Sequence, residues 1–338
     1  MGCVIILRAI SRVKGFIRLF YRDFVLWVSD ATTFIDEIFT VRILSGTGTQ
    51  YYWNSLDVHR TLLMDEVRLE AFRQAISEVV KEGDTVLDLG TGTGILSFYA
   101  AEAGAGKVYA VDSAKIIDVG RKAAERQGIG AIEFMRTDVN DLNIPKVDCI
   151  ISELIGMEII DEGIADKIRT AKKYLRDGGA IIPGRIDVVL APVETTEVGL
   201  GFWKRMHGVD YSVVGKVPDK IRNFEAGPGT RRLSPDLVAF SVDLHNPPKK
   251  IRIDAEFTIR EAGEFTGCLM YFRAHLSDNV LLSSAPEEPL THWKQIFIPH
   301  QKRLKMGVGD KVRIRMKPAP ANFGWKWKYD VSRAVQTP

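Results

Sequence analysis

The sequence predicts an α/β part with a doubly wound parallel sheet, followed by an antiparallel β-barrel part. Between Asp84 and Pro183, short apolar runs alternate with helical segments, which indicates a parallel sheet with right-handed crossovers. One apolar run leads directly into three closely spaced glycines. Beyond Gly184, short alternating segments are separated by Gly and Pro turns, which is typical of antiparallel β structure.

Length and composition agree with a two-part globular protein. The 338 residues exceed the size of one typical domain, which is about 100 to 200 residues. With 46% hydrophobic and 26% charged residues, the chain is neither collagen-like, coiled-coil nor wholly disordered. Its three cysteines form no CxxC pair, so we predict no disulfide framework and no metal site, and a reducing, cytoplasmic setting fits best.

The charges are unevenly distributed along the chain. Residues 31–185 carry 18 Lys/Arg against 24 Asp/Glu, whereas residues 186–338 carry 23 against 17. A cleft in the acidic part would attract cationic substrates. An excess of six charges is also what a solvated surface often shows.

The N-terminal extension, residues 1–30, is apolar but interrupted by five cations. Since no uninterrupted apolar run reaches 18 residues, it is not a membrane-spanning helix. Aromatic residues lie between the cations, which indicates a basic amphipathic helix. This helix would pack on the protein itself or rest on a membrane surface, and both alternatives stay open. The cations and aromatics are Arg8, Arg12, Lys14, Arg18, Arg22, Phe16, Phe20, Phe24 and Trp27.

The elements expected after this extension follow from hydrophobic periodicity. Residues 59–80 have apolar residues at helical spacing, so one helix is predicted there. Strands are then expected at 85–90, 107–112, 132–138, 147–152 and 178–183, with helices ending about 103, near 115–127 and near 162–175. The first structural part therefore covers 31–183 and the second 184–338. Alternating segments at 250–259, 311–317 and 325–331 belong to the β part.

The turn after the first strand predicts a nucleotide site. The glycines at 90, 92 and 94 allow backbone to approach a ligand closely. Asp112 ends the next strand about 20 residues on, where a carboxylate can bind both ribose hydroxyls. A dinucleotide fold would place a third glycine where Ile95 stands, so an NAD-dependent dehydrogenase is disfavoured, and no Lys-Ser or Lys-Thr follows as in a P-loop.

The spacing D-x-G-x-G-x-G, formed by Asp88, Gly90, Gly92 and Gly94, resembles motif I of the S-adenosylmethionine-dependent methyltransferases. That resemblance implies a Rossmann-like domain with S-adenosyl-L-methionine as cofactor. It also implies that Asp112 binds the ribose and that Asp138 and Val139 border the adenine.

The segment after the fourth strand, residues 152–163, carries two carboxylates nine positions apart. Glu153 follows the strand and Glu162 opens the next predicted helix, so the intervening loop can bring both into one pocket. Two adjacent carboxylates repel and one would normally be protonated. A guanidinium between them removes this problem, because it is planar, always charged and able to donate in pairs.

With this loop, the chain resembles the protein arginine methyltransferases over roughly residues 50 to 330. Besides motif I, the resemblance rests on the two-glutamate spacing, on Thr291-His292-Trp293 and on the segment 59–68. It implies transfer of a methyl group to a protein or peptide with an exposed arginine. Glu153 and Glu162 would hold the arginine, His292 with Asp65 would assist catalysis, Trp293 would bind substrate, and His59 and Arg68 would contact the cofactor.

Structural alternatives accompany several of these residues. Glu162 could be an acid that complements a helix dipole. His292 could be a structural histidine, and Arg68 could form a surface ion pair.

The chain departs from the family pattern where Leu154 and Met157 replace the two aromatics that usually follow the first glutamate. This leaves substrate, product and activity open. The family's dimerisation arm would fall near 194–215 and looks shortened, so a homodimer is a hypothesis. Two rival functions stay open: a methyltransferase acting on RNA or DNA bases, which the basic β part would suit, and a cofactor-binding scaffold without turnover. A nucleic acid partner is a less favoured interpretation than a protein or peptide substrate.

Overall fold

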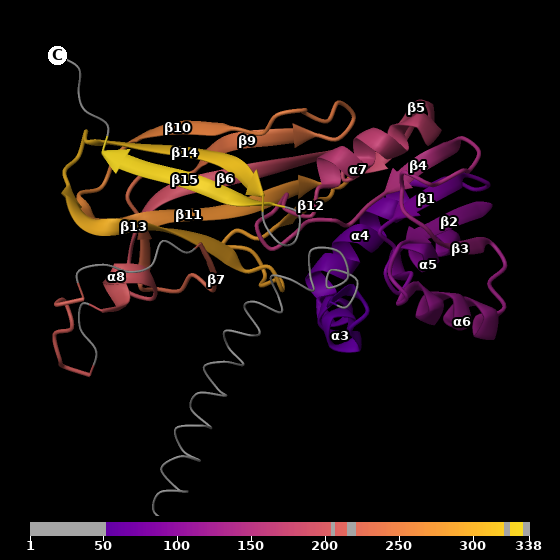
Figure 1. Ribbon diagram of the computed structural model, residues 1–338, viewed down its shortest axis with the longest axis horizontal. Coiled ribbons are helices and arrows are strands. Elements are labelled where there is room, and N and C mark those ends of the chain that lie inside the picture. Colours follow the sequence, from indigo (N-terminus) through magenta and orange to yellow (C-terminus); the bar gives the residue numbers. More distant parts are fainter. Residues whose placement is uncertain (1–51, 204–206, 215–220, 321–324, 334–338) are drawn as a thin grey trace, which may run out of the picture. The chain divides into compact units, whose positions relative to one another are not determined.

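A five-stranded parallel sheet forms the first part of the computed structural model (Figure 1). Its strand order is β3-β2-β1-β4-β5, and every neighbouring pair is parallel. The central strands β1 and β4 are largely apolar and almost wholly buried, as expected for a parallel sheet covered on both faces, whereas the edge strands β3 and β5 are partly exposed. Their bounds are β1 Thr85–Leu89, β2 Lys107–Asp112, β3 Ile132–Arg136, β4 Val147–Ile151 and β5 Leu175–Ile182.

Helices cover this sheet on both faces. Successive connections run outward from β1 to β3 and then from β4 to β5, so right-handed crossovers place α5 and α6 on one face and α7 on the other (Figure 1). The helices are α5 Ile95–Glu102, α6 Ile117–Gln127 and α7 Ile164–Ala171, which a short 3-10 helix, η2 Lys172–Tyr174, follows. The doubly wound α/β prediction is confirmed.

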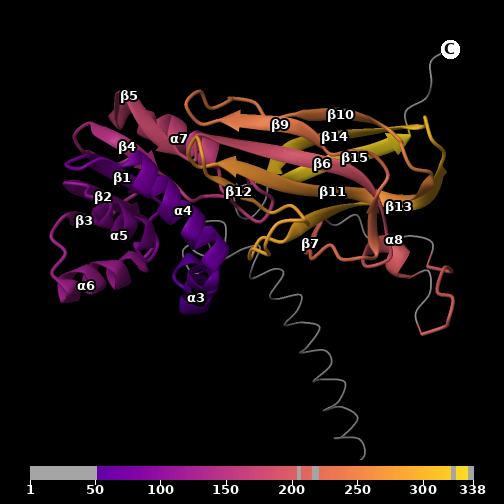
Figure 2. The same cartoon turned by 180° about the vertical axis from the view of Figure 1, so that it is seen from behind.

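The single helix predicted over 59–80 was wrong. The structure has two helices there, α3 Leu56–Met64 and α4 Glu66–Val79 (Figure 2). Asp65 separates them with a non-helical backbone, and its carboxylate accepts a hydrogen bond from the Arg68 N–H at 3.0 Å. An aspartate in this capping position stabilises the start of a helix and interrupts the preceding one. The break therefore orients the Asp65 side chain, which matters at the site.

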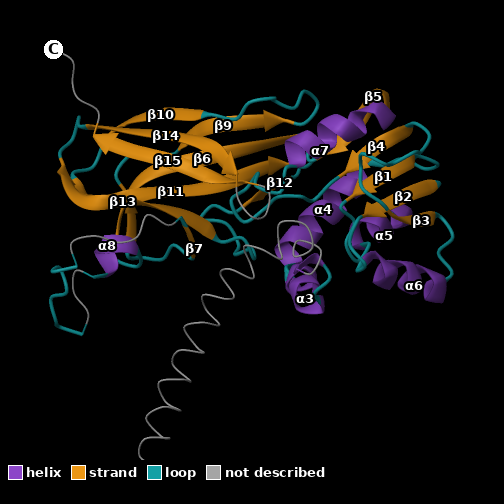
Figure 3. Ribbon diagram, in the orientation of Figure 1, coloured by secondary structure: helices purple, strands orange, loops and turns teal. Residues whose placement is uncertain are grey.

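The second part consists almost entirely of antiparallel strands (Figure 3). One sheet has the order β7-β13-β11-β6-β8, with β12 paired to β11 and β9 to β6, and a second sheet has the order β10-β14-β15. The predicted antiparallel β domain is confirmed, as a curled half-barrel. The strands are β6 Arg185–Thr195, β7 Arg222–Phe224, β8 Thr230–Arg232, β9 Leu237–Asp243, β10 Ile253–Thr258, β11 Gly263–His275, β12 Leu281–Ser283, β13 Gln295–Met306, β14 Lys311–Pro320 and β15 Trp325–Arg333.

The two parts share one hydrophobic core. Buried apolar side chains form a continuous cluster from Phe72 on α4 to Trp327 on β15. The predicted boundary near 183 falls in the turn between β5 and β6, yet residues Trp53–Pro338 constitute one compact unit. The loop after β4 can therefore contact residues of the β part as well as residues of its own part.

The structure describes residues 52–203, 207–214, 221–320 and 325–333. The predicted N-terminal amphipathic helix and its membrane contact lie outside these residues. Within the described ranges, no helix is both long and apolar enough to cross a membrane. Of the arm expected near 194–215, the structure describes the end of β6, the short helix α8 Gly199–Phe202 and residues 207–214.

Candidate functional site

The glycine turn lies between β1 and α5. Gly90, Gly92 and Gly94 have φ values of 80°, 55° and 87°, which residues with a side chain rarely adopt. A β carbon on Gly92 would lie 3.0 Å from Cε1 of His59, and one on Gly90 would lie 2.7 Å from Cδ2 of Leu154. His59 itself is buried, its Nε2–H donates to the Trp53 carbonyl at 2.9 Å, and its pKa is lowered by burial. The three glycines therefore leave room for the His59 and Leu154 side chains to lie close to the backbone of the turn.

Asp88, which the sequence groups with the cofactor motif, is enclosed by its own neighbours. Its side chain is fully buried, and Oδ2 accepts hydrogen bonds from the Thr91 hydroxyl at 2.6 Å and the Ser97 hydroxyl at 2.7 Å. Burial raises its pKa to about 6. The carboxylate points inward along β1 and ties the turn to α5. We therefore assign Asp88 a positioning role.

Asp112 ends β2 beside the same turn. Its Oδ2 accepts from the Gly92 N–H at 2.9 Å and its Oδ1 from the Ala114 N–H at 2.8 Å. A carboxylate has about four acceptor positions, so two remain for ribose hydroxyls. Asp138 is exposed and bonded to Asn140, whereas the Val139 side chain packs in the core. Val139 could therefore border a base with its backbone and not with its side chain.

Arg68 lies on α4 and contacts the first glutamate of the loop. Its Nη1 donates to Oε2 of Glu153 at 2.5 Å, and its Nη2 donates to the Leu62 carbonyl at 2.7 Å. Both side chains are largely buried, so the surface-pair alternative for Arg68 does not hold. Its Nε is also buried and has no hydrogen-bond partner among the described residues. This unpaired donor fits the carboxylate of a methionine-type cofactor.

Glu162, the second glutamate, precedes α7 by two residues, so the helix predicted to open at this position begins later, at Ile164. Its side chain is partly buried and makes no hydrogen bond or ion pair within the part of the chain described here. Burial raises its pKa, and the charge of Glu153 raises it further. The two carboxylates are therefore close neighbours, and the site favours a cation that would keep both ionised.

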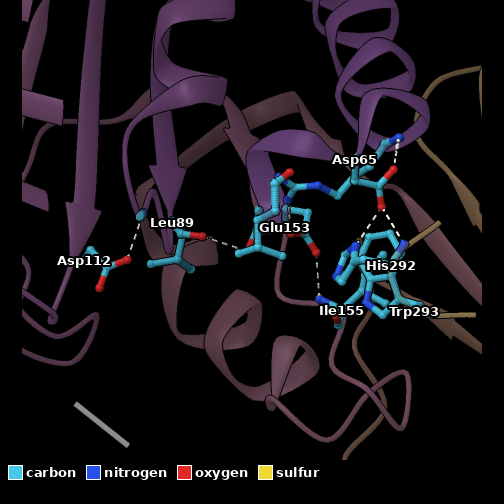
Figure 4. A network of polar contacts seen from close by, with 11 residues as sticks. Asp65, Leu89, Asp112, Glu153, Ile155, His292 and Trp293 are labelled. Carbon is cyan, nitrogen blue, oxygen red and sulfur yellow. Dashed lines mark hydrogen bonds and ion pairs between the residues drawn. The ribbon is translucent and has the colours of Figure 1, made fainter. Parts of the chain in front are cut away.

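Asp65 and His292 form a hydrogen-bonded pair between the two parts of the chain (Figure 4). Oδ2 of Asp65 lies 2.7 Å from Nδ1 of His292 and accepts the His292 backbone N–H at 2.9 Å. Burial would raise the pKa of Asp65, but its hydrogen bonds with His292 outweigh burial and lower it. An ionised Asp65 holds the Nδ1–H tautomer, which leaves Nε2 of a neutral imidazole as an acceptor.

We expect Asp65→Asn to lower the free energy of unfolding by about 2 kcal/mol at neutral pH, the range for hydrogen bonds to a charged group. Because the folded-state pKa of Asp65 is depressed, its ionisation stabilises the fold above the ordinary value of 3.8, and this contribution disappears as the pH falls through the folded value. Denaturant unfolding of both proteins from pH 7 to pH 3 tests this. A difference between them that does not shrink in acid would contradict it.

Trp293, next to His292, contacts the loop that carries the two glutamates. Its indole N–H donates to the Ile155 carbonyl at 2.7 Å (Figure 4), and its side chain is buried. Leu154 packs on Gly90, whereas Met157 is 41% exposed at the loop tip. The Trp293 side chain therefore supports the loop by bonding to the loop's backbone. Leu154 and Met157, the two positions that lack an aromatic residue, occupy different environments.

Sequence reasoning missed three residues that fix the glutamate loop: Asn223 and Trp327 in the β part and Glu158 in the loop itself. Asn223 on β7 donates through Nδ2 to the Met157 carbonyl at 3.0 Å and to the Trp293 carbonyl at 3.2 Å. Glu158 and Trp327 contact each other across the loop and β15. The partners are 66 to 169 residues apart in sequence, so no local pattern could reveal them.

Two consecutive segments of the chain match known protein families. A family model described as a methyltransferase domain matches residues 86–179, and one described as the arginine methyltransferase oligomerization subdomain matches residues 186–332. The first covers the glycine turn and both glutamates, and the second covers most of the β part.

Relatives and solved structures agree with these models. Protein arginine N-methyltransferase 1 of Dictyostelium discoideum is 29% identical over 287 residues, which are 80% of this chain and 84% of that protein. The histone-arginine methyltransferase CARMER of Aedes aegypti is 29% identical over 290 residues; the match covers 78% of this chain and 48% of that protein, so the chain spans about half of its length.

The fold is also similar to that of a chain in the solved Trypanosoma brucei PRMT1 enzyme-prozyme heterotetrameric complex with AdoHcy, with a TM-score of 0.71, 22% identity, and coverage of 84% of this chain and 95% of that chain. The two family models follow one another along the chain and together include the site described above. This chain belongs to the protein arginine methyltransferase family, with an S-adenosylmethionine-dependent methyltransferase domain followed by the family's C-terminal subdomain.

Proposed function

We propose that this protein transfers a methyl group from S-adenosylmethionine to a guanidinium nitrogen of an arginine in a protein or peptide. The observation that carries this proposal is the pair Glu153 and Glu162, in which the second carboxylate has no hydrogen-bond partner among the described residues. A planar cation with several N–H donors satisfies both groups and cancels their repulsion.

The chain's own residues would bind and orient the arginine. Glu153 already engages Arg68 through Oε2 and the Ile155 N–H through Oε1, so its orientation is set before a substrate arrives. Glu162 would become ionised as the guanidinium binds, because an opposite charge lowers a raised carboxyl pKa. Positioning and electrostatics of this kind supply most of the acceleration in a transfer between two bound groups.

The pair Asp65 and His292 would receive the proton that the methylated nitrogen loses. Because Nδ1 of His292 is bonded to Asp65, Nε2 is the ring nitrogen that would accept this proton, and the ionised Asp65 stabilises the imidazolium that results. His292 therefore acts as general base in this proposal, and Trp293 supports the loop that carries the substrate-binding carboxylates.

The cofactor would be held by residues from three elements. Arg68 would offer its unpaired Nε–H to the methionine carboxylate, Asp112 would accept from the ribose hydroxyls, and the glycine turn would let the protein backbone approach the ligand closely. S-adenosylmethionine supplies a methyl group activated on a positively charged sulfur.

The test is methylation of arginine peptides by the purified chain with methyl-labelled S-adenosylmethionine, followed by hydrolysis and mass spectrometry. Label in methylarginine supports the proposal. Label in nucleic acid, in another amino acid or nowhere would overturn it, the last outcome favouring the scaffold alternative.

One observation disfavours the nucleic acid alternative. Three basic residues of β14 that would suit a phosphate backbone, Lys311, Arg313 and Arg315, are engaged by acidic neighbours. Lys311 pairs with Glu256, and Arg313 with Asp254. These ion pairs support a solvated protein face.

For quaternary structure, we propose a homodimer formed through the arm. Trp203 is 38% exposed and packs edge-on against Phe202 and Tyr211, with ring centroids 5.3 and 6.4 Å apart. Aromatic clusters of this kind are typical interface anchors. The second family model is described as an oligomerization subdomain.

Light scattering at micromolar concentration should give twice the 37.8 kDa chain mass. The double variant Trp203→Ala/Tyr211→Ala should give the monomer mass, because truncating aromatic anchors removes most of an interface's binding free energy. Val308→Ala, at an exposed position of the turn after β13, is the matched control and should remain dimeric. A monomeric wild-type chain would exclude the homodimer.

A further inference from the structure

The loop that carries Glu153 and Glu162 has an unusual backbone. Residues 156 and 159 form a one-pair antiparallel bridge, with Gly156 N–H to Ile159 carbonyl at 3.1 Å and the reverse bond at 2.9 Å. Ile159 has φ of 77°, in the left-handed region that β-branched residues rarely enter. Such a conformation persists only where surrounding contacts determine it. The loop therefore depends on its neighbours for its shape.

Glu158 supplies these contacts at the loop tip. Its Oε2 accepts the backbone N–H of Trp327 at 2.9 Å, and its carbonyl accepts the Trp327 indole N–H at 3.1 Å. Its own N–H donates to Oδ1 of Asp161 at 2.9 Å, one residue before the second glutamate. The carboxylate and the carbonyl of Glu158 thus both accept hydrogen bonds from Trp327 on β15.

Trp327 is a firm support for this contact. Its side chain is 4% exposed and belongs to the main hydrophobic core, and its strand is paired with β14 over nine positions. Since its partner lies midway between the two glutamates in sequence, a shift at Glu158 would change the separation of both carboxylates. The other supports, Asn223 and Trp293, contact different carbonyls of the loop.

We propose that Glu158 and Trp327 form a positioning pair, the loop clamp, which holds the loop in the shape that lets Glu153 and Glu162 bind the same guanidinium. This inference rests on the proposed function. Neither residue touches the reacting atoms in this proposal; both act through the two glutamates. A misplacement of catalytic groups by about 1 Å can lower the rate about 100-fold, so a partly released loop should lower kcat.

The test compares Glu158→Ala, Glu158→Gln, Trp327→Phe and the Glu158→Ala/Trp327→Phe double variant. Glu158→Ala should lower kcat about tenfold with KM for S-adenosylmethionine changed less than about twofold. Glu158→Gln keeps an acceptor oxygen and should restore most of the activity. Because both single variants act on one clamp, the double variant should lose less than the product of their effects. Glu125→Ala, at an exposed position on α6, is the control.

Hydrogen exchange at the amides of Glu158 and Ile159 gives a second readout that needs no turnover. These amides should exchange at least about tenfold faster in Glu158→Ala than in wild type or Glu125→Ala. If Glu158→Ala does not fold, the comparison of Glu158→Gln with Trp327→Phe decides: the kcat of Glu158→Gln should be close to that of wild type, and the kcat of Trp327→Phe should be lower. Equal rates in all variants, or unchanged exchange, would overturn the clamp. A wild-type chain that methylates no arginine would overturn the proposed function, while loop exchange would still test the clamp.

Discussion

Glu162→Gln is expected to lower methyl transfer to an arginine peptide by about 1,000-fold, a loss typical for removal of a group that stabilises charge in the reacting complex. Glutamine keeps the size and one acceptor of the side chain but cannot pair with a guanidinium. Affinity for S-adenosylmethionine should be unchanged, since Glu162 is not among the residues proposed to hold it. Initial rates with labelled cofactor and calorimetric titration measure the two effects separately.

Ionisation of Glu162 should make the activity and the stability of the wild-type protein change in opposite directions with pH. Activity of the wild type should rise with pH as Glu162 ionises, and this limb should be absent from Glu162→Gln. Stability should change the other way: the folded protein retains a proton longer than the unfolded chain, so the wild-type free energy of unfolding falls as pH rises from the ordinary carboxyl value of 4.5 to the raised value. Glu162→Gln should therefore gain stability relative to wild type across that window.

Asp166→Asn is the matched control for Glu162→Gln. Asp166 is an exposed carboxylate on α7 that pairs with Arg169, so its removal should change neither rate nor cofactor affinity. If Glu162→Gln retained more than about a tenth of the wild-type rate, the two-carboxylate proposal would have to be abandoned.

Asp112→Ala is expected to weaken S-adenosylmethionine binding about 100-fold, which corresponds to about 2.7 kcal/mol. Two charge-assisted hydrogen bonds to the ribose would be lost. The variant also frees the Gly92 and Ala114 N–H groups that Asp112 holds, so the turn loses support as well. Asp112→Asn, which can still accept hydrogen bonds, should lie between the two. Calorimetric titration of each protein with the cofactor measures the dissociation constants.

Asp141→Ala provides the comparison for Asp112, because Asp141 is exposed in the loop after β3 and should bind the cofactor as wild type does. Melting temperatures of the unliganded proteins separate loss of binding from loss of folding. Equal dissociation constants for Asp112→Ala and wild type would remove Asp112 from the cofactor site.

The sheet and the glycine turn were predictable because their signals are local. A buried parallel strand is an apolar run of about five residues, and a turn that needs left-handed backbone requires glycine. The carboxyl ends of adjacent parallel strands meet at one edge, so Asp112 and the turn after β1 were bound to be neighbours. Glu153 and Glu162 were predictable as a pair, since one short loop joins them.

Other features depended on tertiary contacts. Helical periodicity runs through residues 59–80 without a gap, yet Asp65 breaks the helix and turns its carboxylate to His292, which is 227 residues away. Asp88 is polar in sequence, but its position on β1 points it into the protein, where two hydroxyls satisfy one of its oxygens. Neither outcome follows from a window of neighbouring residues.

The sequence by itself therefore determined the fold class, the glycine turn and the set of carboxylates from which the site is built. The tertiary structure alone decided how those groups are held: Arg68 against Glu153, Asp65 against His292, and Glu158 against Trp327. The physical reason is range. Backbone propensity and hydrophobic period act over a few residues, whereas these hydrogen bonds join groups 85 to 227 positions apart and exist only once the chain has folded; the pairs Asp65–His292 and Glu158–Trp327 also require the two parts to share one core.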